Sequence, residues 1–284
     1  MIIIQLSGGL GNQMFQYALY LQLNAQGRKV KMDDRTEYQG SNSRNIQLPF
    51  FHTEYEIASR HEIDLMTDSF MDPFHRIKRK VFGRKRVAYH EKGNSYNSEV
   101  FQFNTMYMEG CWQSEKYFKD SREVLCSTLT LRDEYRTEKE RAYLSRINKV
   151  QSVGIHIRRG DYLASEVQDL YGNICTEEYY RKAICEIKKN MPEAEFFVFT
   201  NDIDWARANI SDRNFTIVDC STEETGYLDM DLMSHCKHNI IANSSFSWWA
   251  SYLNPNPDKM VIAPKIWLNG RDCSDIYRSG MLVI

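Results

Sequence analysis

Apolar strand patterns alternate with helical patterns along most of the chain. The continuous apolar run from Ile2 to Leu6 predicts a buried strand, and the turn Ser7 to Gln13 follows it. Apolar residues at helical spacing from Met14 to Leu21 then predict a helix that ends near Gly27. A short strand at Lys29 to Met32 completes a βαβ unit, which implies a parallel sheet.

The second half repeats this alternation more clearly. We expect strands at Val153 to Ile157, Phe196 to Thr200, Phe215 to Val218, Asn239 to Ala242 and Met260 to Ala263, the last of which closes the sheet. We expect helices at Arg132 to Asn148, Thr176 to Asn190 and Gly226 to Lys237, and a last helix that ends at Asn254. The pattern predicts an α/β protein with two Rossmann-like domains, residues 1–149 and 150–284.

The middle of the chain, Asp34 to Asn104, is irregular. After it, a strand resumes at Met106 to Met108, and Glu109 to Phe118 turns into a helix with Ser114 as its N-cap. Within the irregular part, Arg76 to Arg86 holds seven Lys or Arg residues among apolar ones. Such runs are usually a solvated face or a loop, and the alternative is a patch that meets an anionic membrane or an anionic acceptor.

Composition narrows the class of protein. The 284 residues carry a net charge of -2, so the global charge gives no argument for binding nucleic acid. Seven cysteines, an odd number without close pairs, suggest reduced thiols. Met1 runs directly into the first strand and leaves no room for a leader or an anchor. We therefore expect a cytoplasmic protein, with the basic run as the one feature that would hold it peripherally on the inner membrane face.

The motif HIRRGDY, His156 to Tyr162, follows a predicted buried strand at its carboxyl end, where α/β proteins bind ligands. Adjacent side chains alternate across a strand, so we expect one of Arg158 and Arg159 to enter a cleft and the other to brace the loop. A guanidinium offers a planar set of donors that suits a phosphate. Asp161 can fix an arginine or accept a proton. The alternative is a salt-bridged surface turn.

The turn SGGLGNQ opens the first helix. Gly9 and Gly11 suggest a dinucleotide motif, but Met14 replaces the third glycine and no Walker lysine is present. The turn can still offer backbone N–H groups to an anion or a sugar hydroxyl, and Asn12 adds an amide. The alternative is a tight turn without a ligand.

Two further strand ends carry polar residues. Asp202 can cap the next helix or accept hydrogen bonds from N1 and N2 of guanine. The segment NSSFSWW, Asn243 to Trp249, starts a helix where hydroxyls and N–H groups suit a pyrophosphate, unless Ser244 or Ser245 is only a helix cap. Because the carboxyl ends of parallel strands share one edge, these turns and the arginine loop are expected to converge on one nucleotide diphosphate.

Trp112 stands at a strand end and could stack on a sugar or pack in the core. We expect no metal site. His235, Cys236 and His238, with Cys220 upstream, lack a recognised zinc spacing, and the pair Asp33 and Asp34 is a weak candidate for a divalent ion.

Four blocks of sequence carry a resemblance to a known family. IIIQLSGGLGNQMFQYA, EGCWQSEKYF, HIRRGDY and IIANSSFSWWASYLN occur in the order found in bacterial α-1,2-fucosyltransferases of glycosyltransferase family 11, which the chain resembles. The resemblance implies a GT-B-like fold with two domains facing a cleft, GDP-L-fucose as donor, the 2-hydroxyl of a galactose as acceptor, inversion at the anomeric carbon and no metal requirement. The first domain would then serve the acceptor and the second the donor.

The resemblance also implies roles for single residues. Arg158 would contact the pyrophosphate, Arg159 would hold the loop, and His156 would lie near the nucleotide. Asp202 would read guanine, and Asn12 would lie near the reacting groups beside Gly9 and Gly11. The residues expected to bind phosphate are Ser244, Ser245, Phe246 and Ser247.

The general base is left open. Asp161 is the first candidate and Glu166 the second, although Asp161 could instead be a structural partner of Arg159. Two other functions also stay open: a GDP-sugar hydrolase or transferase of other specificity, and a galactoside-binding protein without catalysis. The acceptor would be a galactose-terminated oligosaccharide, free or lipid-linked.

Overall fold

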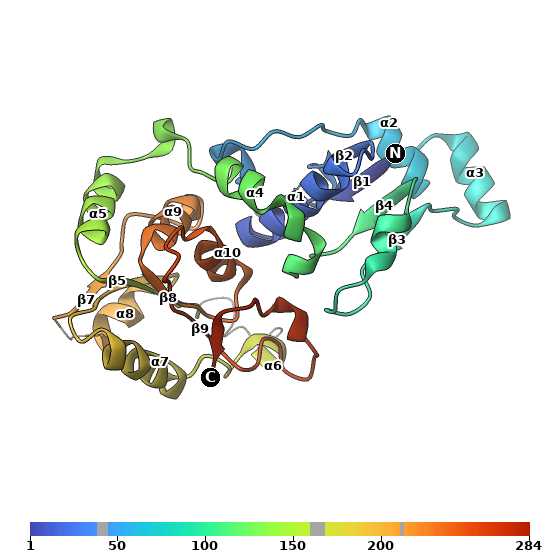
Figure 1. Cartoon of the computed structure of the whole chain (residues 1–284). Helices are drawn as coiled ribbons and strands as arrows, with labels where there is room; N and C mark the ends of the chain where they lie inside the picture. Colours follow the sequence, from blue (N-terminus) through green and yellow to red (C-terminus); the bar gives the residue numbers. More distant parts are fainter. Residues whose placement is uncertain (39–44, 160–167, 211–212) are drawn as a thin grey trace. The chain divides into compact units, whose positions relative to one another are not determined.

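The computed structural model describes residues 1–38, 45–159, 168–210 and 213–284. Packing divides the chain into two compact units (Figure 1). The first comprises Met1–Pro49 and Thr53–Leu125, and the second comprises Phe50–His52 and Cys126–Ile284. The sequence suggested a boundary near Lys149, whereas the residues from Cys126 onward pack with the second unit.

The first unit is built on a parallel sheet. Within the described residues its strands have the order β2-β1-β4-β3. They are β1 (Ile2–Gln5), β2 (Val30–Asp33), β3 (Ala88–His90) and β4 (Met106–Glu109). Helix α1 (Leu10–Ala25) joins β1 to β2, which confirms the βαβ opening. Because α1 is buried around most of its circumference, it is a core helix of this unit.

The second unit holds a larger parallel sheet, with the order β10-β9-β8-β5-β6-β7 in the described residues. The strands are β5 (Ser152–Ile157), β6 (Glu195–Thr200), β7 (Phe215–Ile217), β8 (His238–Ile240), β9 (Val261–Ala263) and β10 (Met281–Val283). The prediction that Met260 to Ala263 closes the sheet was wrong, because β10 pairs with the outer side of β9. Strand β10 has only three residues, which are apolar but partly exposed at the edge of the sheet, so only a short apolar run marks it in the sequence.

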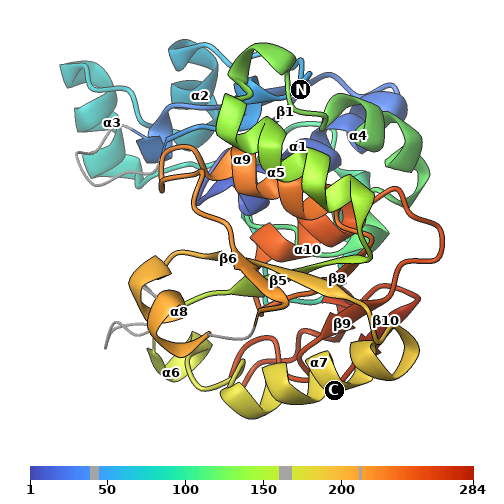
Figure 2. The same cartoon turned by 90° about the vertical axis from the view of Figure 1, so that its left-hand side faces the viewer.

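Helices cover both faces of this sheet. Figure 2 shows α5 (Glu138–Lys149), α9 (Gly226–His235) and α10 (Ser245–Leu253) on one face, with α7 (Glu177–Asn190) on the other. Ile155 and Ile157 of β5 share a core cluster with Ile187 of α7. Helix α5 begins later than predicted because Thr137 caps it, accepting a hydrogen bond of 3.1 Å from the Glu140 amide. Shorter helices are α6 (Gln168–Tyr171) and α8 (Ile203–Asn209).

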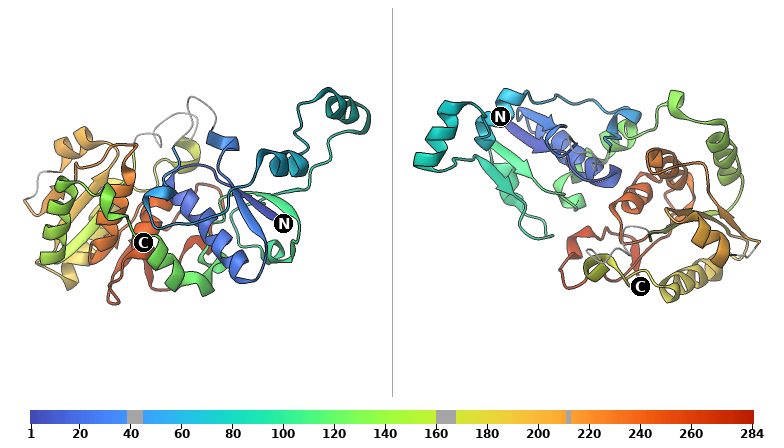
Figure 3. Two further views of the ribbon diagram at one scale, coloured as in Figure 1. Left: turned by 90° about the horizontal axis from the view of Figure 1, so that it is seen from above. Right: turned by 180° about the vertical axis from the view of Figure 1, so that it is seen from behind.

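In its described residues, the irregular middle of the sequence contains the helices α2 (Arg60–Thr67) and α3 (Pro73–Phe82). Figure 3 shows α3, in teal, at the outer end of the first unit. The segment predicted to be a helix after Ser114 is a 3-10 turn, Glu115–Tyr117, and α4 (Arg122–Thr128) follows it. No helix within the described ranges is both long and apolar enough to span a bilayer.

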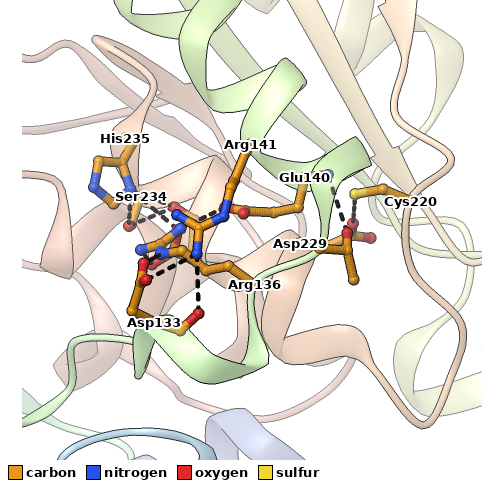
Figure 4. Close-up of polar contacts among 10 residues, drawn as sticks. Asp133, Arg136, Glu140, Arg141, Cys220, Asp229, Ser234 and His235 are labelled. Carbon is orange, nitrogen blue, oxygen red and sulfur yellow. Dashed lines mark hydrogen bonds and ion pairs between the residues drawn. The ribbon is translucent and has the colours of Figure 1, made fainter.

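A buried ion cluster joins α5 to α9 (Figure 4). Arg136 donates two hydrogen bonds to Asp231, of 2.6 and 3.0 Å, and also pairs with Glu140. Burial raises the pKa of Glu140, although Arg136 opposes that shift. Asp229, on the same helix as Asp231, is buried beside Cys220.

Candidate functional site

Three neighbouring strands of the second unit end in polar turns at one edge of the sheet. Strand β5 lies between β6 and β8, and the chain reverses its direction of winding there. Arg158 and Arg159 follow β5, Asp202 follows β6, and Ser244 follows β8. A crevice outside the carboxyl ends at such a switch point is where open α/β sheets bind ligands. We refer to these turns together as the switch-point edge.

Arg159 is held by the turn after β6. Its amide donates to Oδ1 of Asn201 at 2.9 Å, and its Nε lies 3.4 Å from Oδ2 of Asp202. The guanidinium also lies 4.1 Å from the centroid of the Trp205 ring, a cation–π contact. The side chain of Arg159 is therefore committed to contacts within the protein. Arg158 is half-buried at the same edge.

Asp202 caps α8. Its Oδ1 accepts a hydrogen bond of 3.1 Å from the Trp205 amide, and its own amide donates to Thr200 Oγ1 at 3.1 Å. With Arg159 at Oδ2, both carboxylate oxygens have a protein partner. A carboxylate has about four acceptor positions, so a guanine edge would have to share the group with these contacts.

His156 is almost fully buried in β5, and its ring centroid lies 5.3 Å from that of Phe246 at the start of α10. The hydroxyl of Tyr180 on α7 donates to the His156 carbonyl at 2.9 Å. The histidine thus connects the central strand to the first turn of α10, a relation that the sequence does not reveal.

The loop before α10 is fixed by its own residues. Ser247 is fully buried; its Oγ accepts from the Ala242 amide at 3.2 Å and lies 3.3 Å from the Ser244 carbonyl, to which it donates. The Ser247 hydroxyl is therefore engaged within the loop, and phosphate binding by this residue stays a prediction. Ser244 occupies the N-cap position but makes no capping hydrogen bond through its side chain. Ser245 and Phe246 are half-exposed.

Asn243 also holds this loop, although sequence reasoning did not single it out. Its Nδ2 donates to the carbonyls of Tyr171 and Trp267, each at 3.2 Å. Cys175 lies 3.4 Å from its Oδ1, and burial raises the pKa of that thiol to about 12. The cysteine is thus a neutral thiol that packs behind the loop.

The first unit carries a second polar edge, where β1 and β4 end. Gly8 has a φ of 71°, and a Cβ on it would lie 2.6 Å from Nδ2 of Asn12. Gln113, which follows β4, donates to Oδ1 of Asn12 at 2.9 Å. Gly9 is the extended N-cap of α1, and Gly11 is buried in its first turn. The residue that needs glycine at this turn is therefore Gly8, which the motif comparison passed over.

Trp112 lies in the core of the first unit and has no exposed surface. Its ring stacks on Tyr89 and meets Tyr117 edge-on. Its backbone has a φ of 55°, and Oε2 of Glu91 accepts its amide at 3.0 Å. Burial raises the pKa of Glu91. Both faces of the indole are covered, so the structure does not present Trp112 to an acceptor sugar.

The remaining predictions concern the general base and a metal site. Asp161 and Glu166 fall outside the described residues, so the general base stays a prediction. Within the described ranges, no group of three or more His, Cys, Asp or Glu residues is placed to hold a metal ion. Asp33 instead accepts hydrogen bonds from Thr36 and from the Tyr107 hydroxyl, the latter at 2.7 Å. His238 accepts one from the Met260 amide at 3.0 Å.

Related proteins share this sequence over almost its full length. An α-1,2-colitosyltransferase from Escherichia coli is 31% identical over 274 residues, which cover 94% of this chain and 92% of the relative. The O-antigen biosynthesis glycosyltransferase WbnK from Escherichia coli is 28% identical, with 95% and 96% covered. Galactoside α-(1,2)-fucosyltransferase 1 from Ateles belzebuth is 26% identical, with 87% of this chain and 63% of the relative covered.

Solved structures share the fold. The chain matches NodZ α-1,6-fucosyltransferase with a TM-score of 0.52 at 16% identity, over 89% of this chain and 92% of that one. This confirms the predicted GT-B-like class, with two Rossmann-like units. The model of glycosyl transferase family 11 matches residues 1–282. The chain therefore belongs to glycosyltransferase family 11.

Proposed function

We propose that the protein is an inverting glycosyltransferase that moves L-fucose from GDP-β-L-fucose to the 2-hydroxyl of a terminal galactose. Family membership supports the reaction class, and the names of two relatives support a 1,2 linkage. The name of the O-antigen relative favours a bacterial surface oligosaccharide as acceptor, free or lipid-linked. Seven free thiols favour a reducing compartment, and we therefore place the reaction in the cytoplasm.

The observation that carries the proposal is the unused cap of α10. The first turn of a helix presents N–H groups that favour an anion, and the Ser244 side chain makes no capping bond to them. Arg158 follows β5, the strand beside β8, and β8 leads into this helix. A helix N-terminus together with a guanidinium is a combination suited to a pyrophosphate.

In the proposed mechanism, the acceptor oxygen attacks the anomeric carbon from the face opposite the nucleotide. The bond from that carbon to the β-phosphate oxygen breaks, and GDP leaves with added negative charge. Arg158 and the α10 amides stabilise this charge more strongly in the transition state than in the bound substrate. The proton of the acceptor hydroxyl passes to a carboxylate, for which Asp161 and Glu166 stay the candidates. The proposal needs no divalent ion to neutralise the leaving group.

A second donor is favoured by one observation, the 31% identity with a colitosyltransferase. Colitose is fucose without its 3-hydroxyl, so a pocket for either sugar would take the same nucleotide and form the same linkage. Which donor is preferred depends on whether a polar group of the protein bonds the 3-hydroxyl.

A donor panel tests the proposal. GDP-fucose, GDP-colitose, GDP-mannose and UDP-galactose are each supplied with β-galactosides in the presence of EDTA, and both transfer and donor hydrolysis are measured. We expect transfer from GDP-fucose or GDP-colitose without metal. Hydrolysis without transfer would indicate a hydrolase, and galactoside binding without donor consumption would indicate a non-catalytic binding protein; either result would refute the proposal.

A further inference from the structure

Helix α3 buries none of its residues, although its ends are well formed. Asp72 caps it, accepting a hydrogen bond of 3.1 Å from the His75 amide, and Pro73 occupies the first turn. Gly83, with a φ of 73°, ends it. The sequence thus specifies a helix whose side chains contribute nothing to the core of the first unit. Most helices in proteins are stabilised by packing of an apolar face, and α3 does not pack such a face onto the first unit.

One face of α3 is apolar and exposed. Phe74, Ile77 and Val81 stand at positions i, i+3 and i+7, which places them on one side of a helix. Their exposed fractions are 71%, 64% and 66%. Met71 and Phe82 add exposed apolar surface at either end. Large apolar side chains gathered in this way mark an interaction site rather than scattered surface residues.

Most of the other side chains of α3, and of the residues that follow it, are basic. The segment from Arg76 to Arg86 carries seven Lys or Arg residues and no acidic residue, on a chain whose net charge is -2. Arg76, Lys78 and Lys80 are exposed. This concentration of positive charge on an otherwise acidic protein predicts a partner with negative charge.

Two arginines hold the helix against α2. Arg79 donates to the carbonyls of Asp68 and Phe70, at 3.0 and 2.7 Å. Arg84 donates to the carbonyl of Thr67 at 3.2 Å. These bonds fix the C-terminal part of α3 and the residue after its cap to the end of α2, while the apolar side chains stay exposed. The helix is therefore presented as a defined surface and not as a loose arm.

We propose that α3 binds the surface of an anionic lipid bilayer, with Phe74, Ile77 and Val81 inserted between the headgroups. Lysine and arginine stems extend along the apolar surface while their charged ends reach the lipid phosphates. A second copy of the chain is a poorer partner, because pairing two α3 helices would bring two sets of like charges together. The inference concerns a surface of the first unit and does not depend on the identity of the donor sugar.

Vesicle flotation of the full chain tests this proposal without donor or acceptor. We expect the protein to float with vesicles that contain phosphatidylglycerol and not with pure phosphatidylcholine, and to dissociate as salt is raised. Each basic residue near an anionic surface contributes roughly five-fold to the partition coefficient. The triple variant Arg76→Ser, Lys78→Ser and Lys80→Ser should therefore lower partition on the order of 100-fold.

The apolar face is tested separately with Phe74→Ser and Ile77→Ser, which should also abolish flotation. Leu65→Ser, at an exposed leucine of α2, and Arg181→Ser, at an exposed arginine of α7, are the matched controls and should float like the wild type. Because α3 buries nothing, all variants should keep the melting temperature of the wild type.

Three results would overturn the proposal. The first is a wild-type chain that does not float with anionic vesicles, and the second is a triple variant that floats as the wild type does. The third is self-association of the wild type, seen by sedimentation, that Phe74→Ser disrupts; it would assign this face to a second copy of the chain.

Discussion

Arg159 and Asp202 connect the ends of two adjacent strands: the guanidinium Nε of the arginine lies 3.4 Å from the carboxylate Oδ2. The two side chains are each about one-third exposed, so the ion pair itself contributes little to stability. Its effect is to fix the turn after β5 against the start of α8. Arg158, the preceding residue, then extends from a braced backbone.

Asp202→Asn separates the two roles of this residue. The amide oxygen can still cap α8, so the free energy of unfolding should change by less than about 0.5 kcal/mol. If Asp202 also reads guanine, the lost charge should weaken GDP binding by roughly ten- to hundred-fold, the value of a hydrogen bond to a charged group. Calorimetric titration with GDP measures this, and Asp204→Asn in the same helix is the control. Unchanged affinity would leave Asp202 as a cap only.

Ser247 and Ser244 should respond to alanine in opposite ways. Ser247→Ala leaves the buried Ala242 amide without the serine oxygen, which should cost about 1–3 kcal/mol of unfolding free energy. Ser244→Ala removes no capping bond, so stability should stay within about 0.5 kcal/mol while GDP affinity falls. Urea denaturation and GDP titration of both variants check this. A large loss of stability in Ser244→Ala, with normal GDP affinity, would contradict the assignment of α10 as the phosphate site.

Gly8→Ala tests the turn that positions Asn12. The new Cβ meets both a left-handed backbone and the Asn12 amide at 2.6 Å, so we expect a loss of more than about 1 kcal/mol together with reduced transfer. Gly27→Ala is the matched control, since Gly27 has a φ of 76° but nothing within 4 Å. It should cost about 1 kcal/mol and leave transfer normal. Equal effects on transfer in the two variants would exclude a special role for the Asn12 turn.

Asp229 should make stability depend on pH. Burial raises the pKa of this carboxyl from 3.8 to about 7, so between these values the native state holds a proton that the unfolded chain has lost. Stability therefore falls as pH rises through this window, by up to about 1.4 kcal/mol per pH unit. Asp229→Asn stays neutral and should flatten this slope between about pH 5 and pH 7.

Denaturation at several pH values measures the slope. Asp133→Asn is the control, because Arg141 lowers the pKa of Asp133 and its contribution changes only in more acidic solution. The control should keep the wild-type slope. A wild-type slope in Asp229→Asn would mean that Asp229 is ionised in the native protein across this range.

The sequence predicted strands such as β1 and β6 because each contains an unbroken apolar run. It missed β3 and β10, which have only three residues each and lie at sheet edges. The site residues that escaped prediction depend on distant partners. Gln113 reaches Asn12 across 101 positions, and Asn243 reaches Tyr171 across 72, so no local pattern could reveal either contact.

The solvent exposure of single side chains was the second property that the sequence did not reveal. A tryptophan at a strand end can stack on a sugar or pack in the core, and the ring partners that decided the case for Trp112 become visible only in the fold. The same holds for Ser247, whose hydroxyl turns inward while Ser244, three residues earlier, leaves its capping position unused.

The linkage and anomeric configuration of the product test the central claim most directly. The wild type is incubated with GDP-β-L-fucose and a β-galactoside in EDTA, and the product is analysed by NMR, with Arg158→Ala and Arg181→Ala in parallel. We expect an α-fucosyl residue on the galactose 2-hydroxyl, a rate reduced by about 10² or more in Arg158→Ala, and a normal rate in Arg181→Ala. A β-linked product, another position of attachment, or wild-type activity in Arg158→Ala would contradict the account.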